Sequence, residues 1–304
     1  MKDNSKKTAA IVVTFNRRKM LMENIEKLLM QTARGSMDIL VIDNASTDGT
    51  EEALGKMISE GDIIYYNTGA NLGGAGGFQY GIRKAYGAGY GFFWLMDDDT
   101  FPEQDALEEL LDADRVLCGS YGFLSSTVYW KDGSLCKMNI QRRTFREKQT
   151  DFISPYSSIV MATFVSFFVK RETVREYGLP IKEFFIWSDD LEYSRRISMH
   201  LPCYLVSSSK IIHCMSNNEK VGIEHEELKR LWRYKYLYRN EVYVFRREGF
   251  KGWVYLFERV ILHIFRVIMK GTDNKMKKIR IISGSFFKGL RFHPAIEYVE
   301  EDQI

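Results

Sequence analysis

Cysteine and proline are both scarce in this sequence, and neither occurs in a recognisable motif. The four cysteines are scattered and form no CxxC pair, which argues against a zinc site or a thiol redox centre: Cys118, Cys136, Cys203 and Cys214. The 5 prolines and the lack of a low-complexity tract are typical of an ordinary globular protein. Free thiols, and no signal peptide before the first apolar run, predict a reducing, cytoplasmic location.

An uncharged hydrophobic run long enough to cross a membrane is also lacking. The best candidate, residues 252–269, is interrupted by Glu258, Arg259 and Arg266, whereas a span needs about 20 largely uncharged residues. The GxSxG motif of α/β-hydrolases and the GK[ST] of a phosphate-binding loop are missing as well. The sequence therefore predicts neither a membrane-spanning chain nor a serine hydrolase.

Charge is abundant but unevenly distributed. Residues 246–291 hold twelve Lys and Arg against three acids, a net charge of +9. Because the whole chain carries a formal +3, the remainder carries −6. A basic region beside an acidic body indicates an anionic partner, either nucleic acid or an anionic membrane surface.

The first half of the chain alternates short apolar runs with helical patterns. Strands are predicted at 9–14, 38–43, 62–67 and 91–96, and helices at 19–31, 50–59, 77–86 and 102–111, with Pro102 as a first helical residue. Such repeats favour an α/β fold with a mostly parallel sheet and helices on both faces. Ligands bind beyond the carboxyl ends of the strands in such sheets.

The second half is less regular. Strands are predicted at 121–130, 159–169, 204–207 and 210–213, and a helix at 189–198. From about residue 224 the pattern is helical to the end. We therefore divide the chain into a catalytic domain, residues 1–220, and a basic helical region, residues 221–304.

Three adjacent carboxylates at the end of the fourth apolar run are the strongest chemical signal. Asp97, Asp98 and Asp99 repel one another, and a cation would compensate that repulsion. Mg²⁺ and Mn²⁺ prefer carboxylate oxygens and share their coordination with substrate phosphates. The alternative is an exposed acidic turn that caps the helix predicted from Pro102.

Glycine is concentrated in NLGGAGGF at 71–78, between a predicted strand and a predicted helix. Glycines allow a backbone to approach a ligand closely, and the N-terminus of the following helix would attract an anion. The segment does not match the dinucleotide fingerprint, because Gln79 stands where GxGxxG needs its last glycine. A flexible strand–helix turn is the alternative.

Two further acids, Asp189 and Asp190, begin a predicted helix in WSDDLEYSRR. They could simply cap the helix, with a Glu192–Arg196 pair behind them. They could equally provide a general base for an acceptor hydroxyl, with Trp187 as a sugar-stacking platform. His213 ends an apolar run, KIIH, where an imidazole could join a carboxylate-bound metal.

These segments together resemble the family 2 glycosyltransferases of the GT-A fold, and within them the galactofuranosyl- and rhamnosyltransferase-like branch. The matching pieces are VTFNR at 13–17, VIDNAST at 41–47, NLGGAGGF at 71–78, WLMDDDT at 94–100, FIWSDDLEY at 185–193, His213 and YLYRN at 236–240. They occur in the family's order through residues 9–240. The Arg17 of FNR and the three-aspartate form resemble the galactofuranosyl branch more than generic members of the family.

The resemblance implies a role for each matching position. Nucleotide contacts would come from Thr14, Phe15, Asn16, Arg17, Asp43, Asn71, Gly73, Gly74, Asp97 and Asp98, with Asp43 at the base. The metal, Mn²⁺ or Mg²⁺, would be bound by Asp97, Asp99 and His213. Asp190 would be the catalytic base of an inverting transfer, Asp189 would assist it and hold acceptor hydroxyls, and Trp187 would contact the acceptor.

The implied substrates are a nucleotide-sugar donor, with UDP-galactofuranose first and dTDP-rhamnose as the alternative, and a glycan or lipid-linked saccharide acceptor. An apolar stripe at helical spacing fits this interpretation: Trp253, Leu256, Phe257, Val260, Ile261, Ile264 and Phe265. With the surrounding Lys and Arg it predicts peripheral association with the inner face of the cell membrane, rather than with nucleic acid. Packing on the catalytic domain or a homo-oligomer contact is the alternative.

Two other functions remain open from the residues alone. A sugar nucleotidyltransferase also uses an α/β sheet, a glycine-rich turn and a metal carboxylate pair. A non-enzymatic module could bind nucleic acid or lipid head groups through the basic region. Against the latter, the acids gather at predicted strand ends instead of being excluded from the fold.

Overall fold

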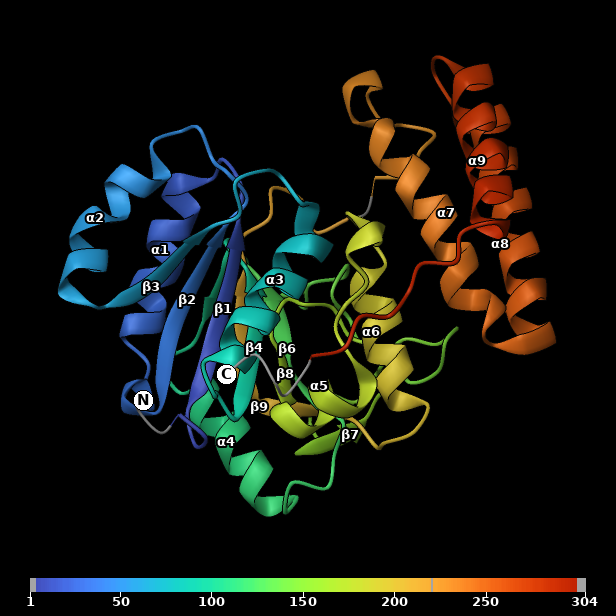
Figure 1. Cartoon of the computed structure of the whole chain (residues 1–304). Helices are drawn as coiled ribbons and strands as arrows, with labels where there is room; N and C mark the ends of the chain where they lie inside the picture. The colour runs from blue at the N-terminus through green and yellow to red at the C-terminus, as the bar shows by residue number, and fades with distance from the viewer. Residues whose placement is uncertain (1–3, 220, 300–304) are drawn as a thin grey trace.

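The computed structural model describes residues 4–219 and 221–299, and its centre is a single nine-stranded sheet (Figure 1). The strand order is β3 (Ile63–Asn67), β2 (Met37–Asp43), β1 (Thr8–Thr14), β4 (Phe92–Asp97), β8 (Phe167–Lys170), β6 (Phe123–Trp130), β9 (Tyr204–His213) and β5 (Thr100–Pro102). A short strand, β7 (Tyr156–Ser158), pairs with β9 outside this order.

The sheet has a parallel half and a mixed half. The strands β3, β2, β1 and β4 are parallel, as the strand–helix alternation predicts. Beyond β4 the pairing changes: β8 is antiparallel to β4 and to β6, and β9 is parallel to β6 but antiparallel to β5 and β7. The predicted α/β fold is confirmed, while its parallel pairing is concentrated in the N-terminal half.

Helices cover both faces of the sheet because buried side chains alternate along each strand. On β1, Ile11 packs toward α3 (Gly73–Gly87), whereas Val12 packs toward α1 (Arg18–Leu29). The face with α1 also carries α2 (Thr50–Glu60) and α4 (Ala106–Val116). The face with α3 carries α5 (Arg171–Tyr177) and α6 (Asp189–Ser198).

Four sequence predictions differ from the structure in this body. Pro102 does not begin a helix; it ends the edge strand β5, where a missing N–H costs no ladder bond, and α4 begins at Ala106. Only the last part of the strand predicted at 159–169 forms, because Ser166 has a left-handed φ of 69° that interrupts the extended run. The two pieces predicted at 204–207 and 210–213 are one strand, β9.

The fourth difference concerns the glycine-rich segment, because α3 begins at Gly73 and not at Gly77. Two glycines of α3, Gly77 in this segment and Gly81 after it, allow close packing of the helix against β1. A Cβ at Gly77 would lie 2.6 Å from Val13 Cγ1, and one at Gly81 would lie 2.6 Å from Ile11 Cγ2. The low helix propensity of glycine is therefore outweighed by a close helix–strand contact.

The C-terminal helices form a layer to one side of the sheet (Figure 1). They are α7 (Trp232–Arg246), α8 (Gly249–Lys270) and α9 (Lys275–Leu290), which pack on one another. The apolar side of α7 joins the body, since Val242 and Phe245 share a buried cluster with Phe184 and Ala75. The predicted domain boundary, residue 220, lies outside the described residues.

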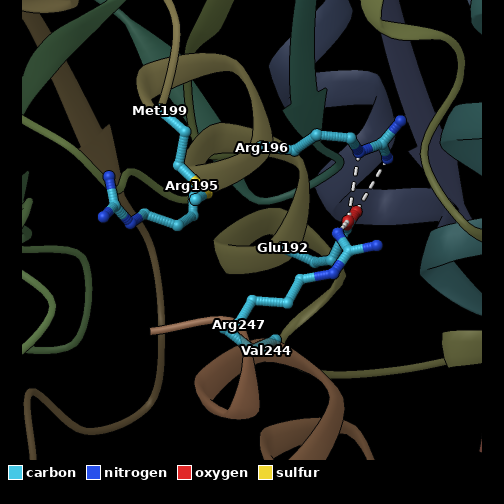
Figure 2. Close-up of a pocket in the computed structure, with 6 residues that line it drawn as sticks. All are labelled: Glu192, Arg195, Arg196, Met199, Val244 and Arg247. Carbon is cyan, nitrogen blue, oxygen red and sulfur yellow. Dashed lines mark hydrogen bonds and ion pairs between the residues drawn. The ribbon is translucent and has the colours of Figure 1, made fainter. Parts of the chain in front are cut away.

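A network of ion pairs ties α6 to α7 (Figure 2). The buried Glu192 accepts hydrogen bonds from Arg196 at 2.7 Å and 3.1 Å and from Arg247 at 3.0 Å. Arg195 pairs with Glu248 in the same way. The small cavity among these side chains is lined by charges that already have partners, so we interpret it as a structural junction. The Glu192–Arg196 pair predicted from the sequence is present.

No helix of residues 4–219 and 221–299 is both long enough and apolar enough to span a membrane. In α8 the run is interrupted at Glu258, Arg259 and Arg266, as the sequence indicates.

Candidate active site

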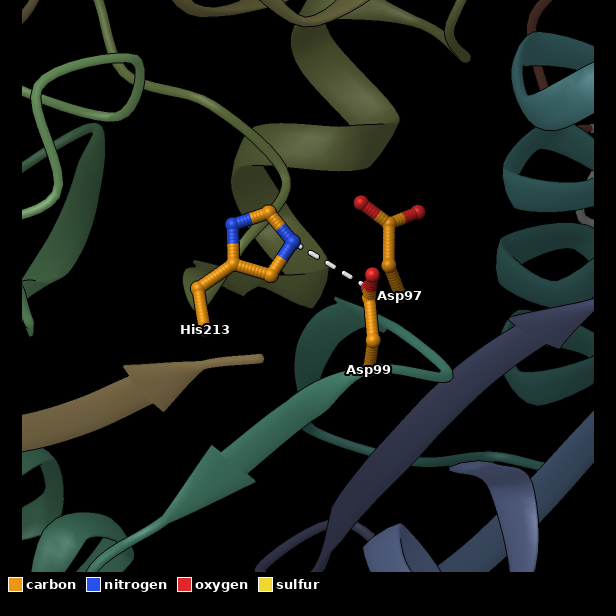
Figure 3. Close-up of side chains that lie close together, drawn as sticks. All are labelled: Asp97, Asp99 and His213. Carbon is orange, nitrogen blue, oxygen red and sulfur yellow. Dashed lines mark hydrogen bonds and ion pairs between the residues drawn. The ribbon is translucent and has the colours of Figure 1, made fainter. Parts of the chain in front are cut away.

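The acidic residues of WLMDDDT lie where β4 ends in the middle of the sheet. Asp97 is the last residue of β4, and Asp98 and Asp99 form the turn into β5. His213 ends β9 directly opposite Thr100 of β5, so the sheet brings it to this turn. Asp97, Asp99 and His213 each offer a ligand atom, and these atoms lie within 4.8 Å of one another (Figure 3). The sheet thus brings His213 beside Asp97 and Asp99, which are distant from it in sequence, while metal binding by the three stays a prediction.

His213 is oriented by hydrogen bonds at both ring nitrogens. Nε2 donates to Asp99 Oδ1 at 3.1 Å, and Nδ1 lies 2.8 Å from Asn139 Oδ1. The Asn139 amide is fixed in turn, because its Nδ2 donates to Thr163 Oγ1 at 3.0 Å. With Nδ1–H donated to Asn139, Nε2 is the nitrogen that faces the carboxylates, as a metal ligand would.

The protonation of this pair follows from its surroundings. Burial would lower the pKa of His213, but the hydrogen bond to Asp99 and the nearby acids outweigh it and raise the pKa to about 10. Burial would likewise raise the pKa of Asp99, but His213 and Arg17 lower it to about 2. Without a metal the pair is therefore an imidazolium beside a carboxylate.

Arg17 supplies the second cation of the turn. Its two guanidinium NH groups reach Asp98 Oδ1 at 3.0 Å and Asp99 Oδ2 at 2.8 Å. The other oxygen of Asp98 accepts a hydrogen bond from Thr14 at 2.8 Å. Both oxygens of Asp98 are thus bound within the protein, so this residue anchors Arg17 and Thr14 and is not one of the three residues of the metal-ligand group.

The pKa values of Asp97 and Asp98 are raised, whereas that of Asp99 is lowered. Burial and the charge of Asp99 raise the pKa of Asp97 to about 6, against the opposing effects of His213 and Arg17. Burial also raises the pKa of Asp98, to about 7. The alternative of an exposed acidic turn is wrong, because Asp98 and Asp99 are buried. Acids held this way are poised to accept a compensating cation.

The donor set fits a divalent cation. Two carboxylates and one imidazole suit Mn²⁺ or Mg²⁺, with water and phosphate oxygens completing the coordination. The ligand atoms are close enough together for one ion to reach all three. A cation there would also relieve the repulsion that raises the pKa of Asp97.

The residues predicted for nucleotide binding surround the carboxyl ends of β1 and β2. Asn16, in a left-handed conformation with φ of 53°, accepts a hydrogen bond from Thr47 N at 2.7 Å. Asp43 accepts hydrogen bonds from Ser46 N at 2.8 Å and from the Tyr65 hydroxyl at 2.7 Å. Phe15 is exposed beside them. Their contacts with a nucleotide stay predictions.

The turn that starts α3 contributes the next group. Asn71 Oδ1 accepts a hydrogen bond from Gly73 N at 2.8 Å. Gly73 has φ of 71°, and a Cβ there would lie 2.2 Å from Phe185 O, so only glycine fits. At Gly74 a Cβ would meet nothing within 4 Å. Gly74 is therefore the glycine of this turn that faces open space, as a ligand contact requires.

Asp189 and Asp190 form the first turn of α6, as predicted, and face the same acidic space. Burial and the charge of Asp190 raise the pKa of Asp189 well above its ordinary value. Burial also raises the pKa of Asp190, to about 6, although Leu191 N donates to its Oδ1 at 2.7 Å. The charge of Asp97 raises the pKa of Asp189 and the pKa of Asp190 further, because the two acidic groups lie close enough to interact.

Trp187 precedes these acids in a loop of unusual backbone conformation. Its ring is half-buried against Tyr234, with ring centroids 5.2 Å apart. Trp187 therefore connects the loop that precedes Asp189 with α7. Its contact with an acceptor stays a prediction.

Three neighbours of the site had no predicted role. Asn139 and Arg142 lie outside the motifs, whereas Asn240 lies in one of them. Asn139 orients His213, and Arg142 interacts electrostatically with Asp190. Both belong to the irregular segment between β6 and β7, which has no periodic pattern to reveal them. Asn240, in YLYRN, hydrogen-bonds the loop before Asp189. Its motif was visible in the sequence, but its contact was not.

A sheet of this order, with a metal-ligand group at its carboxyl edge and a second acidic pair opposite, defines a GT-A glycosyltransferase. A model of the family described as "Glycosyl transferase family 2" matches residues 9–178, more than half of the chain. The chain belongs to this family. A sugar nucleotidyltransferase and a purely binding module are therefore set aside.

Named relatives and solved structures agree with this assignment. Galactofuranosyltransferase GlfT1 of Mycolicibacterium smegmatis is 26% identical over 82% of this chain and 90% of its own length. Galactofuranosyltransferase GlfT1 of Mycobacterium tuberculosis is 28% identical over 82% and 89%. The chain is thus similar to galactofuranosyltransferases over nearly their whole length.

The structural neighbours share the fold at low sequence identity. Two of them are S. aureus TarS 1-349, and GalNAc-T7 with UDP, GalNAc and Mn²⁺. TarS 1-349 has a TM-score of 0.56 and 13% identity over 93% of this chain and 71% of that one. GalNAc-T7 has a TM-score of 0.60 and 16% identity over 95% and 57%, so this chain spans little more than half of it.

Proposed function

We propose that the protein transfers galactofuranose from UDP-galactofuranose to a hydroxyl of a glycan or lipid-linked saccharide, with inversion at the anomeric carbon. The observation that carries the donor is the similarity to two galactofuranosyltransferases over 82% of the chain. Two acidic groups support a single displacement between them: one is ion-paired with Arg17 and His213, and the other has no hydrogen-bonded cation among the described residues.

The donor would lie along the carboxyl ends of β1, β2 and β4. Asp43 and the surface around Asn16 and Phe15 would receive the nucleoside, and Gly74 would let the α3 turn approach the diphosphate. Mn²⁺ or Mg²⁺ would be held by Asp97, Asp99 and His213 and would supply charge neutralisation of the leaving diphosphate. Arg17 would remain anchored on Asp98 beside it.

Asp190 would act from the opposite side of the sugar. It accepts the proton of the acceptor hydroxyl while that oxygen forms a bond to the anomeric carbon. The bond from this carbon to the diphosphate oxygen breaks, and its electron pair leaves with the nucleoside diphosphate. A pKa of about 6 suits this role, since the carboxylate is mostly ionised near neutral pH yet more basic than an ordinary aspartate. Asp189 and Trp187 would hold the acceptor.

Donor turnover tests this function directly. Purified protein is offered UDP-galactofuranose, UDP-galactopyranose or dTDP-rhamnose, with Mn²⁺, Mg²⁺ or a chelator, and released nucleotide is measured. Metal-dependent UDP release from the furanose alone is the expected result. Release from dTDP-rhamnose instead would move the donor assignment while keeping the mechanism, and retention of the donor's anomeric configuration would overturn the single displacement.

We also propose that α8 and α9 rest on the inner, anionic face of the cell membrane. The outward face of α8 carries Phe257, Ile261 and Phe265, whose exposed fractions are 52%, 67% and 57%. Exposed Met276 and Phe287 extend the apolar surface onto α9. The cations of residues 246–291 lie on the same helices, so apolar insertion and attraction to anionic lipid would act together.

Vesicle flotation tests the membrane contact. We expect binding to vesicles that contain phosphatidylglycerol, weaker binding to pure phosphatidylcholine, and weakening by salt. Ile261→Asp and Phe265→Asp should each reduce binding about tenfold, because each removes apolar burial. Ile153→Asp is the matched control, as Ile153 is 92% exposed but lies outside the helical layer. Self-association without vesicle binding would favour the homo-oligomer contact instead.

A further inference from the structure

The loop before the acidic pair of α6 has an unusually costly backbone. Phe185, Trp187 and Ser188 all have left-handed φ values, of 62°, 65° and 67°. None is glycine, and such conformations in bulky residues persist only when surrounding contacts impose them. Contacts from outside the loop are therefore needed to hold the backbone conformation that positions Asp189 and Asp190.

Asn240 of α7 provides the contacts that hold this loop. Its side-chain Nδ2 donates to the carbonyl oxygens of Phe184, Ile186 and Trp187, at 3.0 Å, 3.3 Å and 2.8 Å. Asn240 is fully buried, so no water competes for these carbonyls. The two hydrogens of this one amide are shared among the three carbonyls, so Asn240 contacts the strained loop at three positions.

The orientation of the Asn240 amide is fixed by its neighbour. Arg239 donates to Asn240 Oδ1 from Nε at 2.9 Å and from Nη2 at 2.8 Å. Arg239 Nη2 also donates to Glu183 O at 2.5 Å, at the start of the same loop. Because the amide oxygen faces the guanidinium, the amide nitrogen must face the carbonyls.

The same loop contacts the donor side of the site. Phe185 O accepts a hydrogen bond from Ala75 N at 3.2 Å, in the first turn of α3. That turn is also held independently of the loop, since Gly73 O accepts from Asn44 Nδ2 at 3.0 Å and Gly73 N donates to Asn71. Loosening the loop should therefore displace the acidic pair more than the donor turn.

We propose that Asn240 is a positioning residue for the transfer reaction: it fixes the loop 183–188, and through it places Asp189 and Asp190 relative to the donor turn. This proposal rests on the proposed function, in which Asp190 takes the acceptor proton. It also assigns the C-terminal helical layer a part in the reaction, because α7 completes the site from outside the sheet.

The experiment compares Asn240→Leu with Gln79→Met. Each variant keeps the side-chain shape and removes a buried amide; Gln79 Nε2 donates to Pro180 O at 3.1 Å, shortly before the loop. We expect Asn240→Leu to lower kcat for UDP-galactofuranose turnover about 100-fold, because the base is misplaced. The donor KM and the UDP Kd should stay within about threefold of wild type, and Gln79→Met should keep its kcat.

A second readout needs no substrate. Amide hydrogen exchange of residues 183–190 should become faster in Asn240→Leu and stay unchanged in Gln79→Met, in full-length protein without donor. Arg239→Met, at a less buried position, should show the same change to a smaller extent. It provides a second test of the loop contact if Asn240→Leu does not fold.

The outcomes separate this proposal from the proposed function. Unchanged exchange of 183–190 in both α7 variants, or an unchanged kcat beside faster exchange, overturns the positioning role. Equal kcat losses in Asn240→Leu and Gln79→Met overturn it too, since the effect would then be general destabilisation. Wild-type protein that turns over no sugar nucleotide contradicts the proposed function, while the exchange measurement still decides whether Asn240 holds the loop.

Discussion

Two groups of carboxylates face the same space in this protein, yet their surroundings differ sharply. The acids at the end of β4 have cationic partners, Arg17 and His213, and Asp99 is held ionised by them. Asp189 and Asp190, at the start of α6, have no cation among their hydrogen-bond partners in the described structure, and burial raises both pKa values. Burial also raises the pKa of Asp97 and Asp98, so the two groups differ in their cationic partners and not in burial. Ion pairing with Arg17 and His213 suits the first group to bind positive charge, and the second group is suited to take up a proton.

This difference shows how one site can separate two roles with a single residue type. A carboxylate that binds a metal must remain ionised, whereas a general base must be able to take up a proton near the working pH. The sheet supplies the environment for metal binding, because Arg17 pairs with Asp98 and Asp99 at the end of β4. The loop held by α7 supplies the environment for a general base, because burial raises the pKa of Asp190 more than the charge of Arg142 lowers it.

The largest effect is expected from Asp190→Asn. The amide keeps the shape but accepts no proton, so kcat for transfer should fall about 10³-fold, within the range for loss of a general base. UDP affinity, measured by calorimetry, should stay close to that of wild type, because the donor lies on the other acidic group. If Asp189→Asn loses activity and Asp190→Asn does not, the base is Asp189.

The next effect tests the metal-binding group. Asp99→Asn removes a charged ligand and the partner of both His213 and Arg17, so the stimulation of turnover by Mn²⁺ should fall about 100-fold. Asp98→Asn is the matched control, because Asp98 is adjacent and buried but binds Arg17 and Thr14 instead. Equal losses in the two variants would show that anchoring of Arg17, and not metal binding, dominates.

The division between the two acidic groups was only partly predictable from the sequence. The strand–helix alternation places Asp43 and Asp97 at one edge of the sheet, because parallel strands end together. The apolar run before His213 predicts only a strand that ends there, and it is the pairing of β9 with β5 that brings His213 to this edge. The sequence could not show that Asp98 binds Thr14 and Arg17 instead of joining the metal-ligand group, since adjacent residues on a turn point in directions set by tertiary contacts. Periodicity also reveals nothing of Asn139, which lies in an irregular segment.

The local errors have physical causes of the same kind. Pro102 suits the first turn of a helix and an edge strand equally well, and only the pairing of β5 with β9 decides between them. The glycine-rich segment is a poor helix former, yet α3 begins at Gly73. Glycine at positions 77 and 81 allows a close contact between α3 and β1 that a Cβ would block. In both cases a tertiary contact outweighs a local preference.

The pH dependence of transfer should report the second group. The pKa of Asp190 is raised to about 6, chiefly by burial, and its active form is the deprotonated one. The rate should therefore rise tenfold per pH unit below about 6 and level off above it. An ordinary aspartate would place this limb about two units lower. The measurement is kcat against pH at saturating donor and metal, and a limb near pH 4 would contradict a buried base.

The smallest effect is expected at Asn139, which touches neither acidic group but orients His213. In Asn139→Leu the imidazole loses the acceptor for its Nδ1–H, so the tautomer that presents Nε2 to the carboxylates is no longer favoured. The affinity for Mn²⁺, measured by the loss of the free-ion signal in electron paramagnetic resonance, should weaken about tenfold. Thr163→Val, which removes only the support of Asn139 at 3.0 Å, should weaken it less. If Asn139→Leu binds Mn²⁺ as wild type does, His213 does not depend on this support, and its place in the metal-ligand group would rest on Asp99 alone.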